Sequence, residues 1–332
     1  MKNNLLNIEK ALAAYAVIII HTGFPKTFGI IVDCVVRFAV PLFFMISGYY
    51  CYSMDRKILQ NKIPKKIKHI GKIIIISSII YLIYGILKLM PNKIEIENWL
   101  KGVTSLKSIL QLILFNQVNY ALTLWFLFAL SYCYIIMLFV NKFNLYKISY
   151  ILIPILLSIN IIGTDVMNML GKPIPYLFMN FLFCGFPFFM LGNLINRKKD
   201  IVNKMSNRLI FSFIVIGNLM AILERFITIK KEEYFGTIIV VSCMFILSIN
   251  NTDKFRCNII EKIGEKLSLF IYISHPIIIY IIEKFLYIIN IQKTIFYKYS
   301  FPIIACIITT ILAGIFYCLK NFLLRVCSAN PK

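Results

Sequence analysis

Three ionisable residues lie in the first two hydrophobic stretches of the chain, where such side chains are costly and usually functional. Lys10 and His21 flank the apolar run from 11 to 20, and Arg37 lies in the next run. An imidazole has the unperturbed pKa that suits proton removal near neutrality, so His21 is a candidate general base. A fixed cation in a dry site stabilises a developing oxyanion, which is the role we expect for Arg37.

The spacing of these residues predicts how one helix presents them. Lys10 and His21 are separated by about three helical turns, so they share one face and lie roughly 16 Å apart along the axis. Because the next helix returns through the bilayer, we expect Arg37 at about the depth of His21. Asp33 precedes Arg37 by one helical turn, so a simple ion pair between them is the alternative interpretation.

The composition requires a membrane. Of 332 residues, 60% are hydrophobic and only 15% are charged, with a mean hydropathy of +0.80, which is more apolar surface than a soluble core can bury. We predict an all-α, polytopic integral membrane bundle of about ten transmembrane helices, with residues 1–332 forming one membrane-embedded domain and no separate soluble domain. The predicted spans are 5–24, 33–52, 71–90, 121–140, 148–164, 176–195, 208–227, 235–250, 267–286 and 301–320, of which the fifth and eighth are short.

The charge distribution predicts orientation and not a nucleic-acid partner. The formal charge is +22, but in a multispanning chain Lys and Arg mainly mark the cytoplasmic loops. With the N-terminus inside, 22 basic residues fall on the cytoplasmic side and 10 on the other. We therefore predict a multi-pass protein of the cell membrane with both termini in the cytoplasm.

The densest basic segment, 56–72, surrounds Pro64. We interpret it as a cytoplasmic loop that lies on anionic headgroups, and a landing site for a polyphosphorylated donor is the alternative. The nine cysteines and three histidines show no metal-ligand spacing, so we predict no metal.

Several motifs together resemble one family. Glu9-Lys10 followed by His21, and then Arg37-x-x-Val40-Pro41-Leu42-Phe43-Phe44-x-x-Ser47-Gly48-Tyr49, resemble the start of the acyltransferase family 3 membrane enzymes. Leu124-Trp125-Phe126-Leu127 and Ser268-x-x-x-Tyr272-x-x-His275-Pro276 resemble its later motifs.

The resemblance implies transfer of an acyl group, usually acetyl from cytoplasmic acetyl-CoA, to a hydroxyl of an extracytoplasmic glycan or other envelope molecule. Lys10, near the inner surface, would hold the cytoplasmic portion of the donor. The matching position often holds Arg in the family, and Lys would contact phosphate as a point charge. Thr123 stands where many relatives have His. The expected partners are acyl-CoA, the acceptor and the lipid bilayer.

Four further residues are candidates with simpler alternatives. In the alternative interpretation, His275 donates a hydrogen bond to the backbone carbonyl that Pro276 leaves without a helical donor. Tyr272 is then a core hydrogen-bonding residue. In the simpler alternatives, Trp125 would lie at the outer membrane–water interface, and the Glu224 carboxylate would only compensate the charge of Arg225.

A transporter or flippase for an envelope precursor is the competing function, because Pro- and Gly-interrupted helices suit one. The two halves of the chain show no inverted repeat, however, which favours the enzyme.

Overall fold

A computed structural model describes residues 3–90, 92–229, 231–252, 258–288 and 294–329. Within these ranges all regular secondary structure is helical, and eight helical segments are long and apolar enough to cross a bilayer. The predicted polytopic helical membrane bundle is therefore confirmed. Some basic residues used to predict the orientation lie outside the described residues, namely Lys2, Lys230, Lys254, Arg256, Lys293 and Lys332.

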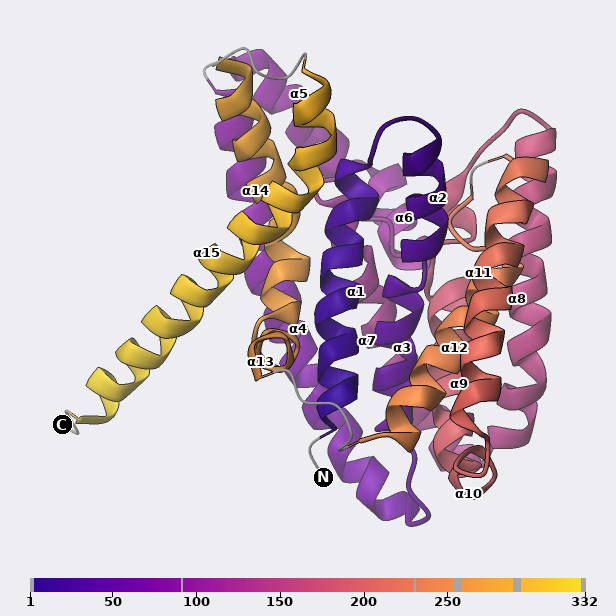
Figure 1. Cartoon of the computed structure of the whole chain (residues 1–332). Coiled ribbons are helices and arrows are strands. Elements are labelled where there is room, and N and C mark those ends of the chain that lie inside the picture. Colours follow the sequence, from indigo (N-terminus) through magenta and orange to yellow (C-terminus); the bar gives the residue numbers. More distant parts are fainter. Residues whose placement is uncertain (1–2, 91, 230, 253–257, 289–293, 330–332) are drawn as a thin grey trace. The chain divides into compact units, whose positions relative to one another are not determined.

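Figure 1 shows the helices in chain order. They are α1 (Asn4–Thr22), α2 (Lys26–Val36), α3 (Ala39–Tyr49), α4 (Arg56–Leu89), α5 (Lys93–Val103), α6 (Leu106–Phe115), α7 (Trp125–Phe143), α8 (Tyr146–Met169), α9 (Phe186–Arg197), α10 (Lys199–Val202), α11 (Asn207–Ile227), α12 (Phe235–Asn250), α13 (Asn258–Lys266), α14 (Ser268–Ile288) and α15 (Ile295–Ala329). Short 3₁₀ segments cover Leu122–Leu124 and Pro175–Leu177, and a π-helical turn covers Phe181–Gly185.

Each of the ten predicted spans overlaps a helix, but two of them are shorter than a full span. The sixth and eighth correspond to apolar helices over Phe181–Arg197 and Phe235–Asn250. The fifth is not short, because α8 extends over 24 residues. Helices α5 and α6 were not predicted, since 11 and 10 residues are too few to span a bilayer.

Two predicted segments have a different local structure. The second span is not one helix: α2 begins at Lys26 and ends at Val36, and α3 begins at Ala39. The basic segment 56–72 is not a loop but the first half of α4, with Pro64 inside the helix. Leu59, Ile63 and Ile70 are buried there, so a helical apolar stripe runs between the lysines.

The chain forms two compact units. The first contains residues 1–39, 206–222 and 239–332, and the second contains residues 40–205 and 223–238. Arg37 therefore belongs to the first unit and most of the motif that follows it belongs to the second.

Helix α1 is the centre of the first unit, where it packs against α2, α13, α14 and α15. Its Ala11, Ala13 and Ala14 are completely buried, and small side chains let neighbouring helices approach closely. At the contact with α13, a Cβ at Gly264 would overlap the carbonyl oxygen of Asn7.

Helices α3 and α9 make a similar close contact in the second unit. A Cβ at Gly48 would overlap the carbonyl oxygen of Phe189, and one at Gly192 would overlap that of Met45. The buried Asn193 side chain donates through Nδ2 to the carbonyl oxygens of Gly48 (3.3 Å) and Cys51 (2.9 Å). The Ser47-Gly48-Tyr49 end of the motif thus has a packing role.

We predict that Gly48→Ala destabilises the protein, because the added methyl group must displace the backbone of α9. Overpacking of this kind costs about 1–3 kcal/mol or more. Gly71→Ala is the matched control, since a Cβ on that helical residue meets no atom within 4 Å and should be neutral or stabilising by up to about 1 kcal/mol. Thermal unfolding of both variants in detergent measures the difference, and equal melting temperatures would contradict the packing role.

Candidate active site

Two histidines of the first unit meet ring to ring. His21 is the penultimate residue of α1, and His275 lies in α14. The ring centroids are 5.0 Å apart and the ring planes are inclined by 37°. His275 is completely buried, whereas His21 is exposed. The sequence suggested each residue as a separate candidate, and the fold brings them into one pair.

The Tyr272-x-x-His275-Pro276 signature fixes the ring of His275 through the backbone. Pro276 has no amide hydrogen, so it cannot donate the helical hydrogen bond to the carbonyl of Tyr272. The Nδ1 atom of His275 lies 2.7 Å from that carbonyl oxygen. This confirms the alternative interpretation, that His275 satisfies the carbonyl freed by Pro276.

The same hydrogen bond determines the tautomer of His275. A carbonyl oxygen can only accept, so Nδ1 must carry the hydrogen, and in a neutral ring Nε2 is then an acceptor. Nε2 is buried and has no hydrogen-bond partner in the part of the chain that the structure describes. This acceptor nitrogen of His275 belongs to the ring that lies beside the exposed imidazole of His21.

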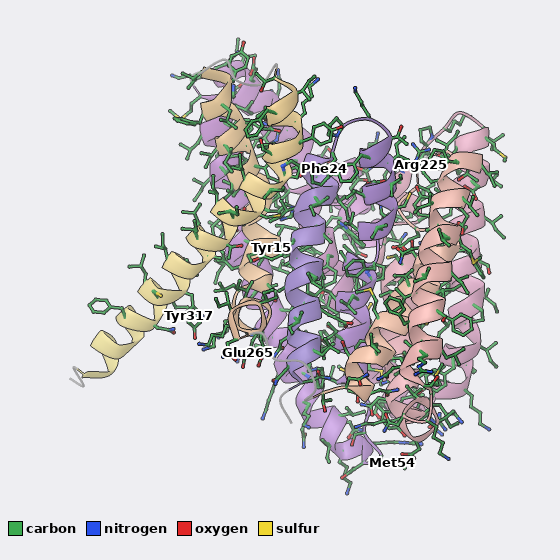
Figure 2. The ribbon with its side chains drawn as sticks, viewed as in Figure 1. Tyr15, Phe24, Met54, Arg225, Glu265 and Tyr317 are labelled. Atoms are coloured by element: carbon green, nitrogen blue, oxygen red, sulfur yellow. The ribbon has the colours of Figure 1, made fainter. Side chains whose placement is uncertain are left out.

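An open hollow begins where α1 ends. Gly23 terminates the helix with φ 66°, a conformation that glycine adopts without steric cost. The hollow encloses about 600 Å³ of space open to the surface. It is lined by Thr22, Gly23, Phe24, Pro25, Glu283, Tyr297, Lys298 and Phe301, and Figure 2 shows Phe24 at this end of α1. His21 directly precedes the first of these residues, so the end of α1 that carries it is accessible.

Arg37 is buried directly after α2 and pairs with Asp33. Its Nη2 atom lies 2.7 Å from Oδ1 of Asp33, which confirms the expected ion pair within one helical turn. Its neighbours Val36 and Phe38 line a hollow together with Tyr15 and Ala16 of α1.

Arg37 is therefore level with the middle of α1. This is about 8 Å below His21 along the helix axis, from the rise per residue. The expectation of equal depth was wrong because α2 begins at Lys26, several residues before the predicted span.

Lys10 lies toward the other end of α1. Its side chain is half-buried, and Nζ donates to Oδ1 of Asn7 at 3.3 Å. The rise of an α-helix places its backbone roughly 16 Å from that of His21. Lys10, Arg37 and His21 thus belong to one unit and lie at three successive levels along α1.

The other two candidates belong to the second unit. Trp125 begins α7 and its ring packs near Phe44, with centroids 6.1 Å apart. Glu224 does not simply compensate Arg225. Its carboxylate accepts hydrogen bonds from the backbone amides of Phe235 (2.8 Å) and Gly236 (3.0 Å) at the start of α12.

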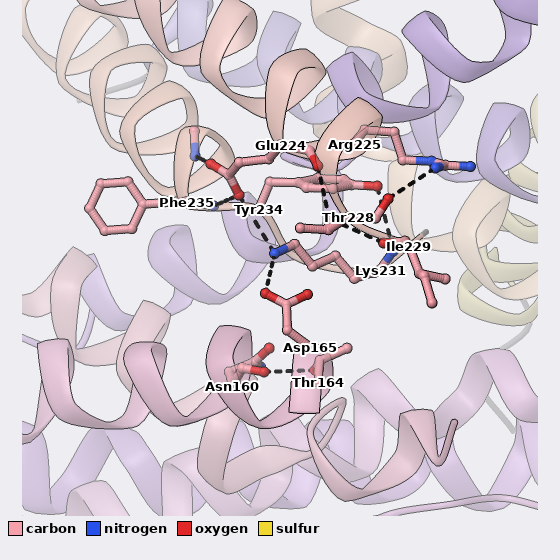
Figure 3. Close-up of polar contacts among 11 residues, drawn as sticks. Asn160, Thr164, Asp165, Glu224, Arg225, Thr228, Ile229, Lys231, Tyr234 and Phe235 are labelled. Carbon is pink, nitrogen blue, oxygen red and sulfur yellow. Dashed lines mark hydrogen bonds and ion pairs between the residues drawn. The ribbon is translucent and has the colours of Figure 1, made fainter. Parts of the chain in front are cut away.

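An ion cluster in the second unit was missed by the sequence reasoning. Figure 3 shows Lys231 between two carboxylates: its Nζ lies 2.9 Å from Asp165 and 3.7 Å from Glu224. Lys231 is only 3% exposed. Asp165 and Lys231 are far apart in the chain, so no local spacing pattern links them. The sequence feature that pointed to this site was Glu224, an acid near the end of a predicted span.

Comparison with known families decides the class of this protein. The family model for the acyltransferase domain of family 3 matches residues 3–319. The chain belongs to acyltransferase family 3. No curated protein and no solved structure matches the chain.

The family match extends over both units of this acyltransferase, so the motif residues in both units belong to the matched domain. The matched region includes the His21–His275 pair, Arg37 and Lys10, together with Trp125. The protein is thus a multi-pass membrane acyltransferase, and its helices carry the candidate catalytic groups.

We predict that Arg37→Met and Asp33→Asn together separate the structural role of Arg37 from its chemical role. Arg37→Met alone leaves Asp33 without its ion-pair partner, and breaking a buried pair costs about 3–5 kcal/mol. The double variant should regain thermal stability because no charge is left behind. Acyl transfer should stay about 10²-fold or more below wild type if Arg37 stabilises the transition state. Recovery of both stability and activity in the double variant would show that Arg37 only neutralises Asp33.

Proposed function

We propose that this acyltransferase moves an acyl group, usually acetyl, from cytoplasmic acyl-CoA to a hydroxyl of an extracytoplasmic glycan or related envelope molecule. The observation that supports this most is the His21–His275 pair. An exposed imidazole lies 5.0 Å from a buried one whose tautomer is fixed by the Tyr272 carbonyl. Such an arrangement suits a general base held by a second residue.

The two histidines have different roles in the proposal. A rotation of the neutral His21 ring would let its N–H group donate to Nε2 of His275. The other nitrogen of His21 would then be the acceptor that takes a proton. His275 is a positioning residue in this arrangement, and His21 is the catalytic base.

The reaction balances with these groups alone. His21 removes the proton from the acceptor hydroxyl as the oxygen attacks the thioester carbonyl. The new carbon–oxygen bond forms, the carbon–sulfur bond breaks, and the CoA thiolate receives the proton from the imidazolium. The products are the ester and free CoA. The Arg37 guanidinium extends back one helical turn to Asp33, toward the end of α2 that follows His21, and from there it would stabilise the oxyanion that develops on the carbonyl.

Lys10 binds the phosphorylated part of the donor in this proposal. Its Nζ donates to the neutral amide of Asn7, a contact that does not cancel its charge, and the Glu265 carboxylate interacts with it electrostatically. The predicted orientation puts the Lys10 end of α1 on the cytoplasmic side, where acyl-CoA is found. The pantetheine arm would pass Arg37 and carry the thioester to His21, a path of roughly 16 Å along the helix.

We predict that changes to the histidine pair separate chemistry from binding. His21→Ala should lower the rate of acyl transfer about 10²–10⁴-fold, the usual contribution of a general base, while acyl-CoA binding is retained. His275→Leu should lower kcat with little change in KM, and His275→Gln should restore part of kcat because its amide oxygen can still accept from His21. Release of free CoA by protein in nanodiscs measures each rate.

Folding is verified by thermal unfolding of each variant. Full turnover in His21→Ala would refute the assignment of the base. If the wild type moves a solute across vesicle membranes without releasing CoA, the transporter is favoured instead.

For Lys10 we predict a defect in donor binding. Lys10→Met removes the charge that contacts the phosphates and should raise the KM for acyl-CoA about tenfold, equivalent to about 1.4 kcal/mol. Lys10→Arg keeps the charge and should keep most of the activity. Steady-state kinetics at varied acyl-CoA concentration measures both parameters, and a loss confined to kcat in Lys10→Met would place Lys10 in the chemical step.

A further inference from the structure

The second unit contains a hollow that the proposed reaction does not use. It lies at one end of α8 and encloses about 450 Å³ of empty space, including its opening. Asn160, Thr164 and Asn168 line it from α8, at intervals of one helical turn. Phe178 and Lys231 line it as well. Its lining residues Pro173, Pro175, Lys231 and Glu232 lie in or next to loops that are predicted to be extracytoplasmic, which is the side expected of the acceptor.

The ion cluster beside the hollow holds its shape and sets its charge. Lys231 is buried between Asp165 (2.9 Å) and Glu224 (3.7 Å), and its Nζ lies 5.6 Å from the centre of the Tyr234 ring. Glu224 is itself fixed by two backbone amides of α12. One ammonium between two carboxylates leaves a net negative charge when all are ionised. Among the described residues that line the hollow, the cation Lys231 is compensated in this way, and Glu232 adds a carboxyl group.

The polar wall of the hollow can both donate and accept hydrogen bonds. The Asn160 amide donates to the carbonyl oxygens of Phe178 (3.1 Å) and Phe183 (3.2 Å), which fixes its orientation. Thr164 donates to the carbonyl oxygen of Asn160 (2.7 Å), so its hydroxyl can accept from a ligand. The buried Nδ2 of Asn168 has no hydrogen-bond partner among the residues described and is available as a donor.

Part of the lining is apolar. It includes Pro173, Pro175 and the ring of Phe178. This ring lies against α8 only because residue 163 is glycine, since a Cβ there would overlap it. A ligand that fits must present hydroxyl groups to the polar residues and C–H groups to the apolar ones, and an aromatic face attracts such C–H groups. A sugar ring has both kinds of group.

We propose that this hollow binds one neutral sugar residue of the acceptor. The inference rests on the proposed acyl transfer to a glycan and names a place where that glycan is held. The hydroxyls of the sugar donate to Thr164 and accept from Asn168, its C–H face stacks on Phe178, and the Lys231 cluster disfavours acidic sugars.

Direct binding of simple sugars to the full-length protein in nanodiscs tests the proposal. The probes are glucose, N-acetylglucosamine and glucuronic acid, which is the anionic counterpart of glucose. We expect at least one neutral sugar to bind and glucuronic acid to bind about tenfold more weakly or not at all. Thr164→Val and Asn168→Leu should each weaken binding of the neutral sugar about tenfold, equivalent to about 1.4 kcal/mol.

Thr104→Val is the matched control. Thr104 makes the same hydrogen bond to the carbonyl one helical turn earlier (2.8 Å to Leu100) but lies directly after α5, outside the hollow, so sugar binding should be unchanged. Failure of every neutral sugar to bind, tightest binding by glucuronic acid, or equal binding by wild type and both hollow variants would overturn the proposal. Release of free CoA by the same wild-type sample, supplied with acyl-CoA and an acceptor preparation from the cell envelope, tests the proposed reaction independently, so the two failures can be told apart.

Discussion

The hydrogen bond from His275 to the carbonyl of Tyr272 is the constraint on which the candidate active site depends. A carbonyl that loses its helical donor inside a bilayer costs several kcal/mol unless another donor replaces it. Pro276 creates that requirement and the imidazole of His275 meets it, at 2.7 Å. Once Nδ1 is used in this way, Nε2 becomes a buried acceptor beside His21. A requirement of helix stability in lipid thus determines which nitrogen is available for chemistry.

The contact between His21 and His275 also requires α1 to approach its neighbouring helices closely. Ala11, Ala13 and Ala14 of α1 are completely buried, and α13 approaches so closely that residue 264 has no room for a side chain. Larger residues would move the axis of α1 outward, and the ring of His21 would move with it. Tyr15 adds a polar contact in the same helix: its hydroxyl oxygen accepts from Thr310 of α15 at 3.1 Å (Figure 2). The same principle explains Gly48 and Gly192 in the second unit.

Relations within one helix were predictable from the sequence, whereas relations between helices were not. The Asp33–Arg37 ion pair and the bond from His275 to the Tyr272 carbonyl follow from the helical repeat, and the structure has both. Contact between His21 and His275, or between Lys231 and Asp165, depends on the rotation and register of packed helices. The pattern of residues within one helix does not specify the rotation and register with which that helix packs against another. The break after α2 was missed for a different reason, because residues 33–52 were interpreted as one span although Pro41 lacks the amide hydrogen that would bond the carbonyl of Arg37.

The partners of the three buried or half-buried cations give each a different electrostatic function. Lys231 lies between two carboxylates, so its charge is overcompensated and serves to hold loops and helices together. The charge of Arg37 is balanced by the Asp33 carboxylate at 2.7 Å, so in the proposed reaction it would stabilise an oxyanion mainly through directed N–H dipoles and not through net charge. Lys10 donates to a neutral amide at 3.3 Å, and the Glu265 carboxylate interacts with it electrostatically. Of the three cations, Lys10 is the one whose described hydrogen bond goes to a neutral group. In the proposed function, the phosphates of the donor would be held at the Lys10 end of α1, while the reacting carbonyl, which carries little charge before attack, would be carried toward His21.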